Sequence, residues 1–167
     1  MIKDKIQKAL NQQINAEFYS SYEYLAMSAY FESVNLSGFA QWMKLQSQEE
    51  YGHAMKIYDY MQQVDGKISL MKIDPPSGGW KSPLDVFKET YAHEQKVTKA
   101  IYALVELAMN EKDFATNNFL QWFVNEQVEE ESTALKILER IKLIGDNKSA
   151  LFLLDREMSQ RTSSPEA

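Results

Sequence analysis

Helical periodicity on both sides of one turn-rich region constrains the fold of this chain more than any other feature. The 167 residues include only six glycines and four prolines, and most of these fall between residues 64 and 84. Before and after that region, apolar residues recur at intervals of three and four, and no strand-like alternation extends beyond a few residues. The sequence therefore predicts an all-α domain whose two helical halves are joined by a long connection.

Residues that favour helix termini mark the ends of the predicted helices. Ser37, Ser82 and Asp113 are candidate N-caps, and Pro83 suits the first position of a helix. Gly145 is a good C-terminal stop. These signals predict helices at about residues 5–34, 38–64, 83–110, 114–145 and, as a short fifth helix, 147–158. We expect one domain over residues 1–160, followed by a polar, disordered tail at 161–167.

The connections predict how these helices are arranged. Helices of about 27–31 residues are ~40–46 Å long, and the short links after the first and third helices make antiparallel hairpins. The link between the second and third helices has about 18 residues, which at ~3.3 Å each can run the length of a bundle. The second and third helices can therefore lie parallel. A four-helix bundle with one long crossover is the ferritin-like arrangement.

Composition excludes several classes of function. The net charge of −6 argues against a nucleic-acid surface and suits cationic ligands. The absence of cysteine excludes disulfides, thiolate zinc sites, iron–sulfur clusters and a thiol nucleophile. No apolar run approaches the ~20 residues of a membrane span, and residues 1–5 lack the apolar segment of a signal peptide. We expect a cytoplasmic protein that binds neither membranes nor nucleic acids.

The inner face of each long helix is apolar except near its middle, where a glutamate interrupts it. These four glutamates are Glu17, Glu50, Glu94 and Glu130. Each lies about 15 to 18 residues from the turn that joins its helix to its hairpin partner, so their heights differ by no more than one turn, ~5 Å. The four carboxylates are therefore predicted to converge, with His53 one turn from Glu50.

Buried carboxylates need compensation, because each uncompensated charge in an apolar core costs several kcal/mol. Either raised pKa values neutralise some of them, or cations bind between them. Oxygen ligands with a single imidazole suit iron(II), with manganese and zinc as competitors. A set with no thiolate and one histidine is a poor structural zinc site.

Other polar residues near this cluster have two interpretations. Glu49, Glu126 and Glu129 flank Glu50 and Glu130, and they form either a solvated acidic face or a third, weaker cation site. Tyr24 is either a core aromatic or an electron or hydrogen-bond donor beside the metals. His93 lies one residue off the inner face and is predicted to be on the surface.

Residues 1 to about 160 resemble the prokaryotic non-haem ferritins. The resemblance rests on the long crossover link and on Glu17, Tyr24, Glu50-x-x-His53, Glu94 and Gln127-x-x-Glu130. It implies a ferroxidase centre with two iron ions, one held by Glu17, Glu50 and His53 and the other by Glu50, Glu94 and Glu130. Gln127 would hydrogen-bond nearby. A third iron would use Glu49, Glu126, Glu129 and Glu130, and 24 identical subunits would form a shell that stores ferric mineral.

Departures from related families narrow this interpretation. Gln127-x-x-Glu130 stands where the general diiron template has a second Glu-x-x-His, which disfavours bacterioferritins and rubrerythrin-like proteins. Tyr51 stands where bacterioferritins carry a haem-ligating methionine, so we expect no haem. In the fifth helix, Leu151, Phe152 and Leu154 form an apolar cluster that we expect to be buried against another subunit.

The sequence thus predicts an iron storage protein with ferroxidase activity, which oxidises Fe(II) with O2 or H2O2 at a diiron centre. Two alternatives remain open. One is a diiron redox enzyme, such as a peroxidase, that stores no mineral. The other is a structural bundle whose central carboxylates are simply protonated.

Overall fold

Helices make up most of the chain. The computed structural model describes residues 2–162, and this part contains five helices and no strand. The helices are α1 (Asp4–Ser33), α2 (Ser37–Gln63), α3 (Pro83–Asn110), α4 (Phe114–Ile144) and α5 (Lys148–Met158). The all-α prediction is confirmed, and the predicted helix ends differ by no more than one residue. None of the described helices is both long and apolar enough to cross a membrane.

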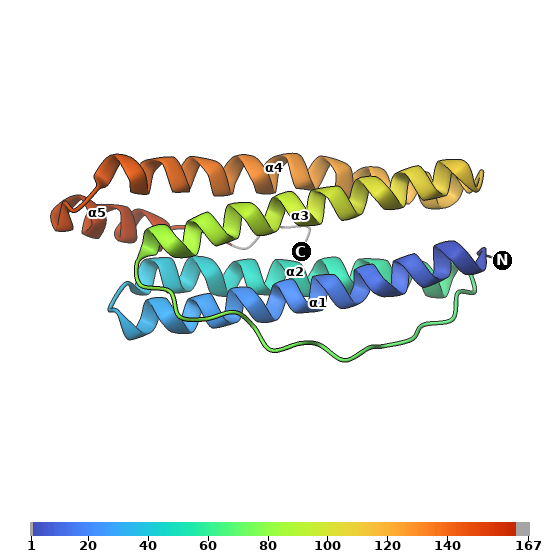
Figure 1. Cartoon of the computed structure of the whole chain (residues 1–167), viewed down its shortest axis with the longest axis horizontal. Helices are drawn as coiled ribbons and strands as arrows, with labels where there is room; N and C mark the ends of the chain where they lie inside the picture. The colour runs from blue at the N-terminus through green and yellow to red at the C-terminus, as the bar shows by residue number, and fades with distance from the viewer. Residues whose placement is uncertain (1, 163–167) are drawn as a thin grey trace.

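The four long helices form two antiparallel hairpins, and the link between them runs along the outside of the bundle (Figure 1). This link starts at the end of α2 and returns to the opposite end of the bundle, where α3 begins, so α2 and α3 are parallel. Polar residues of α1 fix its path. Asn11 accepts from the Ser69 amide at 2.7 Å, and Glu23 accepts from the Ser77 amide at 2.7 Å. The predicted crossover is therefore confirmed.

Two of the three predicted N-caps are confirmed. The Ser82 hydroxyl accepts from the Asp85 amide at 3.1 Å, and the Asp113 carboxylate accepts from the Thr116 amide at 3.0 Å. The prediction for Ser37 is wrong, because this residue is already the first residue of α2.

The start of α2 is capped from a distant helix instead. Asp155 on α5 accepts a hydrogen bond from the Phe39 amide at 2.9 Å and is only 7% exposed. One of the free N–H groups at the start of α2 is thereby satisfied by α5. This contact ties the C-terminal helix to the end of the α1–α2 hairpin.

Gly38 permits this close approach of α5. A Cβ atom at this position would lie 1.7 Å from the Asp155 carbonyl oxygen. We expect Gly38→Ala to push α5 away and to lower the free energy of unfolding by about 3 kcal/mol, although alanine favours helices. Thermal unfolding of the metal-free protein measures this. Gly78→Ala is the matched control, since a Cβ there meets nothing within 4 Å; equal losses in both variants would contradict the argument.

Two apolar clusters fill the bundle, one toward each end. The first includes Phe31 and Phe39, whose rings stack at 5.0 Å, and the second includes Leu10 and Ile57. Buried polar side chains lie between them, at the middle of the four long helices. The apolar ends therefore hold the helices in place around a central polar layer.

The predicted apolar cluster of α5 lies partly in the core and partly on the surface. Leu154 is 2% exposed and packs with Leu151 into the core of its own chain, so the expectation that this cluster lies wholly outside the bundle is wrong for these two residues. Phe152 and the adjacent Leu153 are 60% and 63% exposed. An apolar surface therefore remains on the outer side of α5.

Candidate metal centre

The central polar layer brings the four glutamates and His53 together. Each long helix contributes one glutamate, and α2 adds the histidine one turn after its own. All five side chains are between 1% and 8% exposed. The equal spacing of these residues from the turns therefore places them at one height in the bundle, as the helical rise requires.

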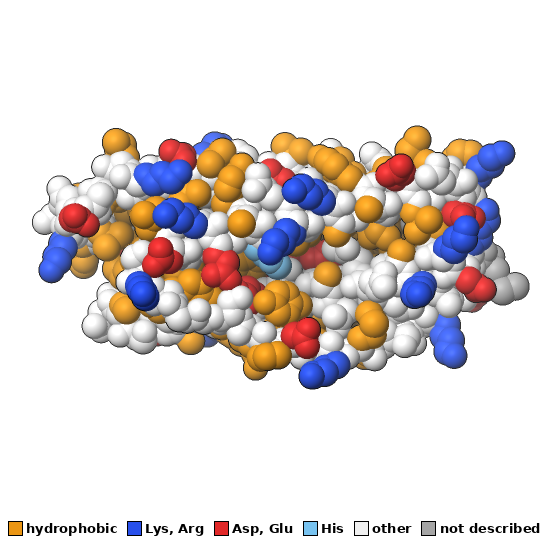
Figure 2. Space-filling model, in the orientation of Figure 1, with side chains coloured by type: hydrophobic (Ala, Val, Ile, Leu, Met, Phe, Trp, Pro, Cys, Tyr) orange, Lys and Arg blue, Asp and Glu red, His pale blue; other side chains and the backbone are white. Residues whose placement is uncertain are grey.

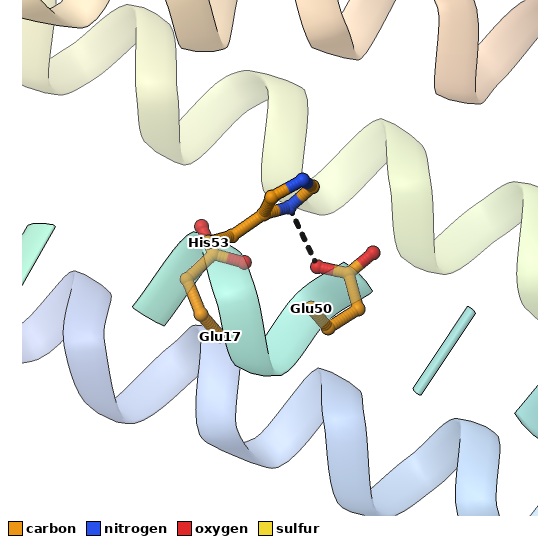
Figure 3. Close-up of side chains that lie close together, drawn as sticks. All are labelled: Glu17, Glu50 and His53. Carbon is orange, nitrogen blue, oxygen red and sulfur yellow. Dashed lines mark hydrogen bonds and ion pairs between the residues drawn. The ribbon is translucent and has the colours of Figure 1, made fainter. Parts of the chain in front are cut away.

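Two possible metal positions share Glu50. In one, ligand atoms of Glu17, Glu50 and His53 lie within 4.8 Å of one another, and these side chains point toward each other (Figure 3). In the other, Glu50, Glu94 and Glu130 meet the same criterion. The two positions are chemically unequal, because only the first has an imidazole.

Hydrogen bonds orient the shared carboxylate. His53 Nδ1 lies 3.1 Å from one oxygen of Glu50. The other oxygen accepts from Gln46 Nε2 at 3.1 Å, and the same nitrogen donates to Glu130 at 2.8 Å. Gln46 therefore bridges α2 and α4 across the centre. The sequence did not single out Gln46, although its position one turn before Glu50 was an available signal.

The outer carboxylates are also held by neighbouring side chains. Gln127 Nε2 donates to a Glu94 carboxylate oxygen at 3.2 Å, and the Tyr24 hydroxyl donates to the other oxygen. Gln13, which the sequence did not single out, donates to Glu17 at 2.8 Å. Tyr24 and Gln127 thus contact the predicted centre directly, and Tyr24 is fully buried beside it.

Burial and mutual repulsion raise the pKa values of three of the four carboxyl groups. Loss of hydration, followed by the charge of Glu50, raises the pKa of Glu17 to about 8 and that of Glu94 to about 8. Burial, followed by the charges of Glu94 and Glu50, also raises the pKa of Glu130. In the metal-free centre at pH 7, the carboxyl groups of Glu17 and Glu94 therefore hold protons.

Glu50 and His53 behave in the opposite way. Burial opposes the ionisation of Glu50, but the positive charge of His53 and the hydrogen bonds from His53 and Gln46 together outweigh it and lower the pKa of that carboxyl group. Burial likewise opposes the protonation of His53, while Glu50 raises the pKa of the imidazole to about 10. The metal-free centre therefore contains one ion pair among neutral acids.

Two buried oxygen atoms are available to coordinate a cation. Within residues 2–162, Glu17 Oε2 and Gln46 Oε1 are the buried side-chain atoms without a hydrogen-bond partner. Leaving a buried acceptor unpaired costs about 1–3 kcal/mol. Metal coordination would satisfy the Glu17 oxygen and remove the protons of the neighbouring acids. The residues present therefore fit bound divalent ions with a preference for oxygen ligands.

The flanking glutamates separate into different environments. Glu126, Glu130 and His53 each offer a ligand atom, and these three atoms lie within 4.8 Å of one another, which gives a third possible metal position. Glu49 is 7% exposed and forms an ion pair with Arg161. Glu129 is exposed and belongs to none of the three ligand groups found among the described residues. The predicted third set, with all four glutamates, is thus only partly brought together.

His93, predicted to lie on the surface, is partly buried in a surface groove. Its Nε2 atom lies 2.7 Å from the Ser20 hydroxyl, and its ring meets the edge of Tyr24 at 5.8 Å. Burial lowers the pKa of this imidazole. His93 lines a groove of about 500 Å³ with Glu23 and Glu89. Figure 2 shows acidic side chains and a histidine near the middle of this face.

Comparison with known proteins identifies the family. The family model for the ferritin-like domain matches residues 7–144. The chain belongs to the ferritin family. Among its relatives, the bacterial non-heme ferritin of Bacteroides fragilis is 50% identical over 161 residues, which cover 96% of this chain and 100% of the relative. That of Campylobacter jejuni is 41% identical, covering 93% of each chain. The predicted resemblance to non-haem ferritins is therefore confirmed.

Solved ferritin structures have the same fold. An open-pore ferritin from the archaeon Archaeoglobus fulgidus superposes with a TM-score of 0.95 at 53% identity, covering 96% of this chain and 98% of that one. A form of the same ferritin that was engineered to be closed gives a TM-score of 0.97 at 52% identity, covering 98% and 100%. The ferritin-like bundle predicted from the sequence is confirmed.

Proposed function

We propose that this ferritin stores iron and that it oxidises Fe(II) with O2 at the two positions that share Glu50. The observation that carries the proposal is this pair of buried ligand groups, one with an imidazole and one made only of carboxylates. A shared carboxylate holds two cations close enough to react with one O2 molecule. The family and the names of its relatives support the same function.

Iron is the substrate of this reaction. Each Fe(II) ion loses one electron, so a pair reduces O2 to hydrogen peroxide with the uptake of two protons. Glu17, Glu94 and Glu130 must give up their protons to bind the ions, and His53 must give up one to expose a lone pair. We expect Gln127 and Tyr24 to keep Glu94 oriented while it exchanges a proton for a metal. Two Fe(II) ions per chain bind here, without haem.

The second position has only carboxylate ligands. We infer that its Fe(III) product can leave by exchange with neighbouring carboxylates, as storage requires. Iron(III) would then collect as hydrated oxide inside a hollow shell of 24 copies in the cytoplasm. The exposed Phe152 and Leu153 on α5 support assembly, because such an apolar surface favours burial against another subunit.

Particle mass tests assembly and storage together. Gel filtration with light scattering, before and after aerobic addition of Fe(II), is expected to give a mass near ~24 times the 19.3 kDa chain, and this mass should rise with added iron. Oxidation without a gain in mass, combined with sustained turnover of peroxide, would instead support a diiron redox enzyme. A metal-free protein that shows no saturable anaerobic Fe(II) binding would support a purely structural bundle.

A further inference from the structure

A positively charged side chain from the C-terminal segment reaches the edge of the metal centre. Arg161 follows α5 and was predicted to lie in a disordered tail. In the structure its guanidinium forms an ion pair with Glu49 and donates to the Trp42 carbonyl oxygen at 3.3 Å. It also lies 4.3 Å above the centre of the Trp42 ring. Its side chain is 19% exposed, so it is packed against α2 rather than extended into solvent.

All of these contacts come from α2. A carboxylate, a backbone carbonyl and an aromatic face are the three groups that a guanidinium binds well, and here they surround one Arg161 side chain. The carboxylate side chain of Glu49 is 9% exposed, so the ion pair is largely shielded from water and salt. Arginine remains charged at every physiological pH. Arg161 therefore gives Glu49 a cationic partner whose charge does not depend on pH.

Glu49 adjoins a ligand of the metal centre as well as Arg161. It directly precedes the shared ligand Glu50, and its charge contributes to the raised pKa of Glu130. Glu130 belongs to the third ligand group, together with Glu126 and His53. Glu49 is thus a carboxylate at the edge of that group, but its charge is already neutralised by Arg161.

We propose that Arg161 controls a third iron position, by holding Glu49 until an ion at Glu126 and Glu130 displaces the guanidinium. This proposal rests on the proposed function, in which iron binds at the neighbouring pair. The Arg161 guanidinium and the third metal ion compete for the Glu49 carboxylate, so this ion binds more weakly while Arg161 is in place. By reciprocity, an ion that recruits Glu49 weakens the attachment of Arg161 and loosens the chain around it.

Metal titration of the assembled, metal-free protein tests the proposal. Anaerobic calorimetry with Fe(II), and separately with Zn(II), is expected to show two tight sites in both wild type and Arg161→Gln. The third ion should bind about tenfold more tightly in the variant, a typical coupling between linked sites. Adding Glu49→Gln to this variant should abolish the gain in affinity for the third ion, because the Glu49 carboxylate that Arg161→Gln releases is then missing.

Arg140→Gln is the matched control. Arg140 pairs with Glu157 at 2.6 Å and joins α4 to α5, but both partners are exposed. Its replacement removes the same charge and loosens the same helix, and the third ion should bind as in wild type. A third site of equal affinity in wild type and Arg161→Gln would overturn the proposal. If wild type shows no two tight sites at all, the proposed function itself would be overturned.

Hydrogen exchange gives a second measurement that needs no variant. The Arg161 amide donates to the Met158 carbonyl at 3.3 Å, at the end of α5. Deuterium uptake by a peptide covering residues 157–162 should rise severalfold when a third equivalent of Zn(II) is added to wild type, but not with the first two. Unchanged uptake at the third equivalent would show that the ion does not displace Arg161.

Discussion

Oxidation of Fe(II) by O2 is expected to slow by roughly a hundredfold or more in Glu50→Gln, a larger loss than replacing a residue outside the ligand set causes. Glu50 belongs to both candidate metal positions, and it is the carboxyl group of the centre whose pKa is lowered. Glutamine keeps its size but offers no negative charge to either ion. The rate is measured by stopped-flow absorbance after mixing two Fe(II) per chain with O2.

Two further variants make this result specific. Glu139→Gln changes an exposed carboxylate on α4, whose partner is Lys142, and should oxidise iron at the wild-type rate. His53→Ala removes the imidazole from only one of the two shared positions, so we expect a smaller loss than in Glu50→Gln. An unchanged initial rate in both Glu50→Gln and His53→Ala would show that oxidation occurs elsewhere in the protein.

The metal-free protein is expected to become more stable when Glu17 is replaced by glutamine. The pKa of Glu17 is raised from 4.5 to about 8 in the folded chain, mainly by burial. Below pH 4.5 the folded and unfolded states are both protonated, and the group costs nothing. As the pH rises from 4.5 to about 8, only the unfolded state ionises, so the folded state loses stability. At pH 7 this loss is roughly 3 kcal/mol.

Glutamine cannot ionise, and its side-chain oxygen can still accept the hydrogen bond from Gln13. The thermal midpoint of metal-free Glu17→Gln should therefore exceed that of wild type at pH 8 and approach it near pH 5. Glu157→Gln, an exposed control, should give no such pH-dependent difference. Equal midpoints at pH 8 would mean that the Glu17 carboxyl group is not held neutral by its surroundings.

Together these expectations describe a centre that costs stability until metal binds. Zn(II) should raise the midpoint of wild type by mass action. The gain should be smaller in Glu17→Gln, which lacks a charged ligand at the first position. A charged ligand such as Glu17 thus lowers the stability of the metal-free fold and raises the affinity of the centre for metal.

Much of the fold follows from the sequence by itself. The turn-forming residues between 64 and 84 and the helical period on either side predict two hairpins and a crossover, because the rise per residue of a helix is fixed. Because the rise is fixed, residues at equal sequence distances from the loop that joins two helices lie at equal heights in the bundle. Glu17, Glu50, Glu94 and Glu130 could therefore be placed together without a structure, since their spacing is a local property of each helix.

Contacts between distant segments were decided only by the tertiary structure. Asp155 caps α2, His93 hydrogen-bonds to Ser20, and Arg161 forms an ion pair with Glu49. Helical period states which face a residue occupies, but not which side chain from another element reaches it or which rotamer it adopts. For that reason the sequence determined the paired candidate metal positions. The partner of Glu49, and with it the character of the third candidate position, depended on how the end of the chain packs back on the bundle.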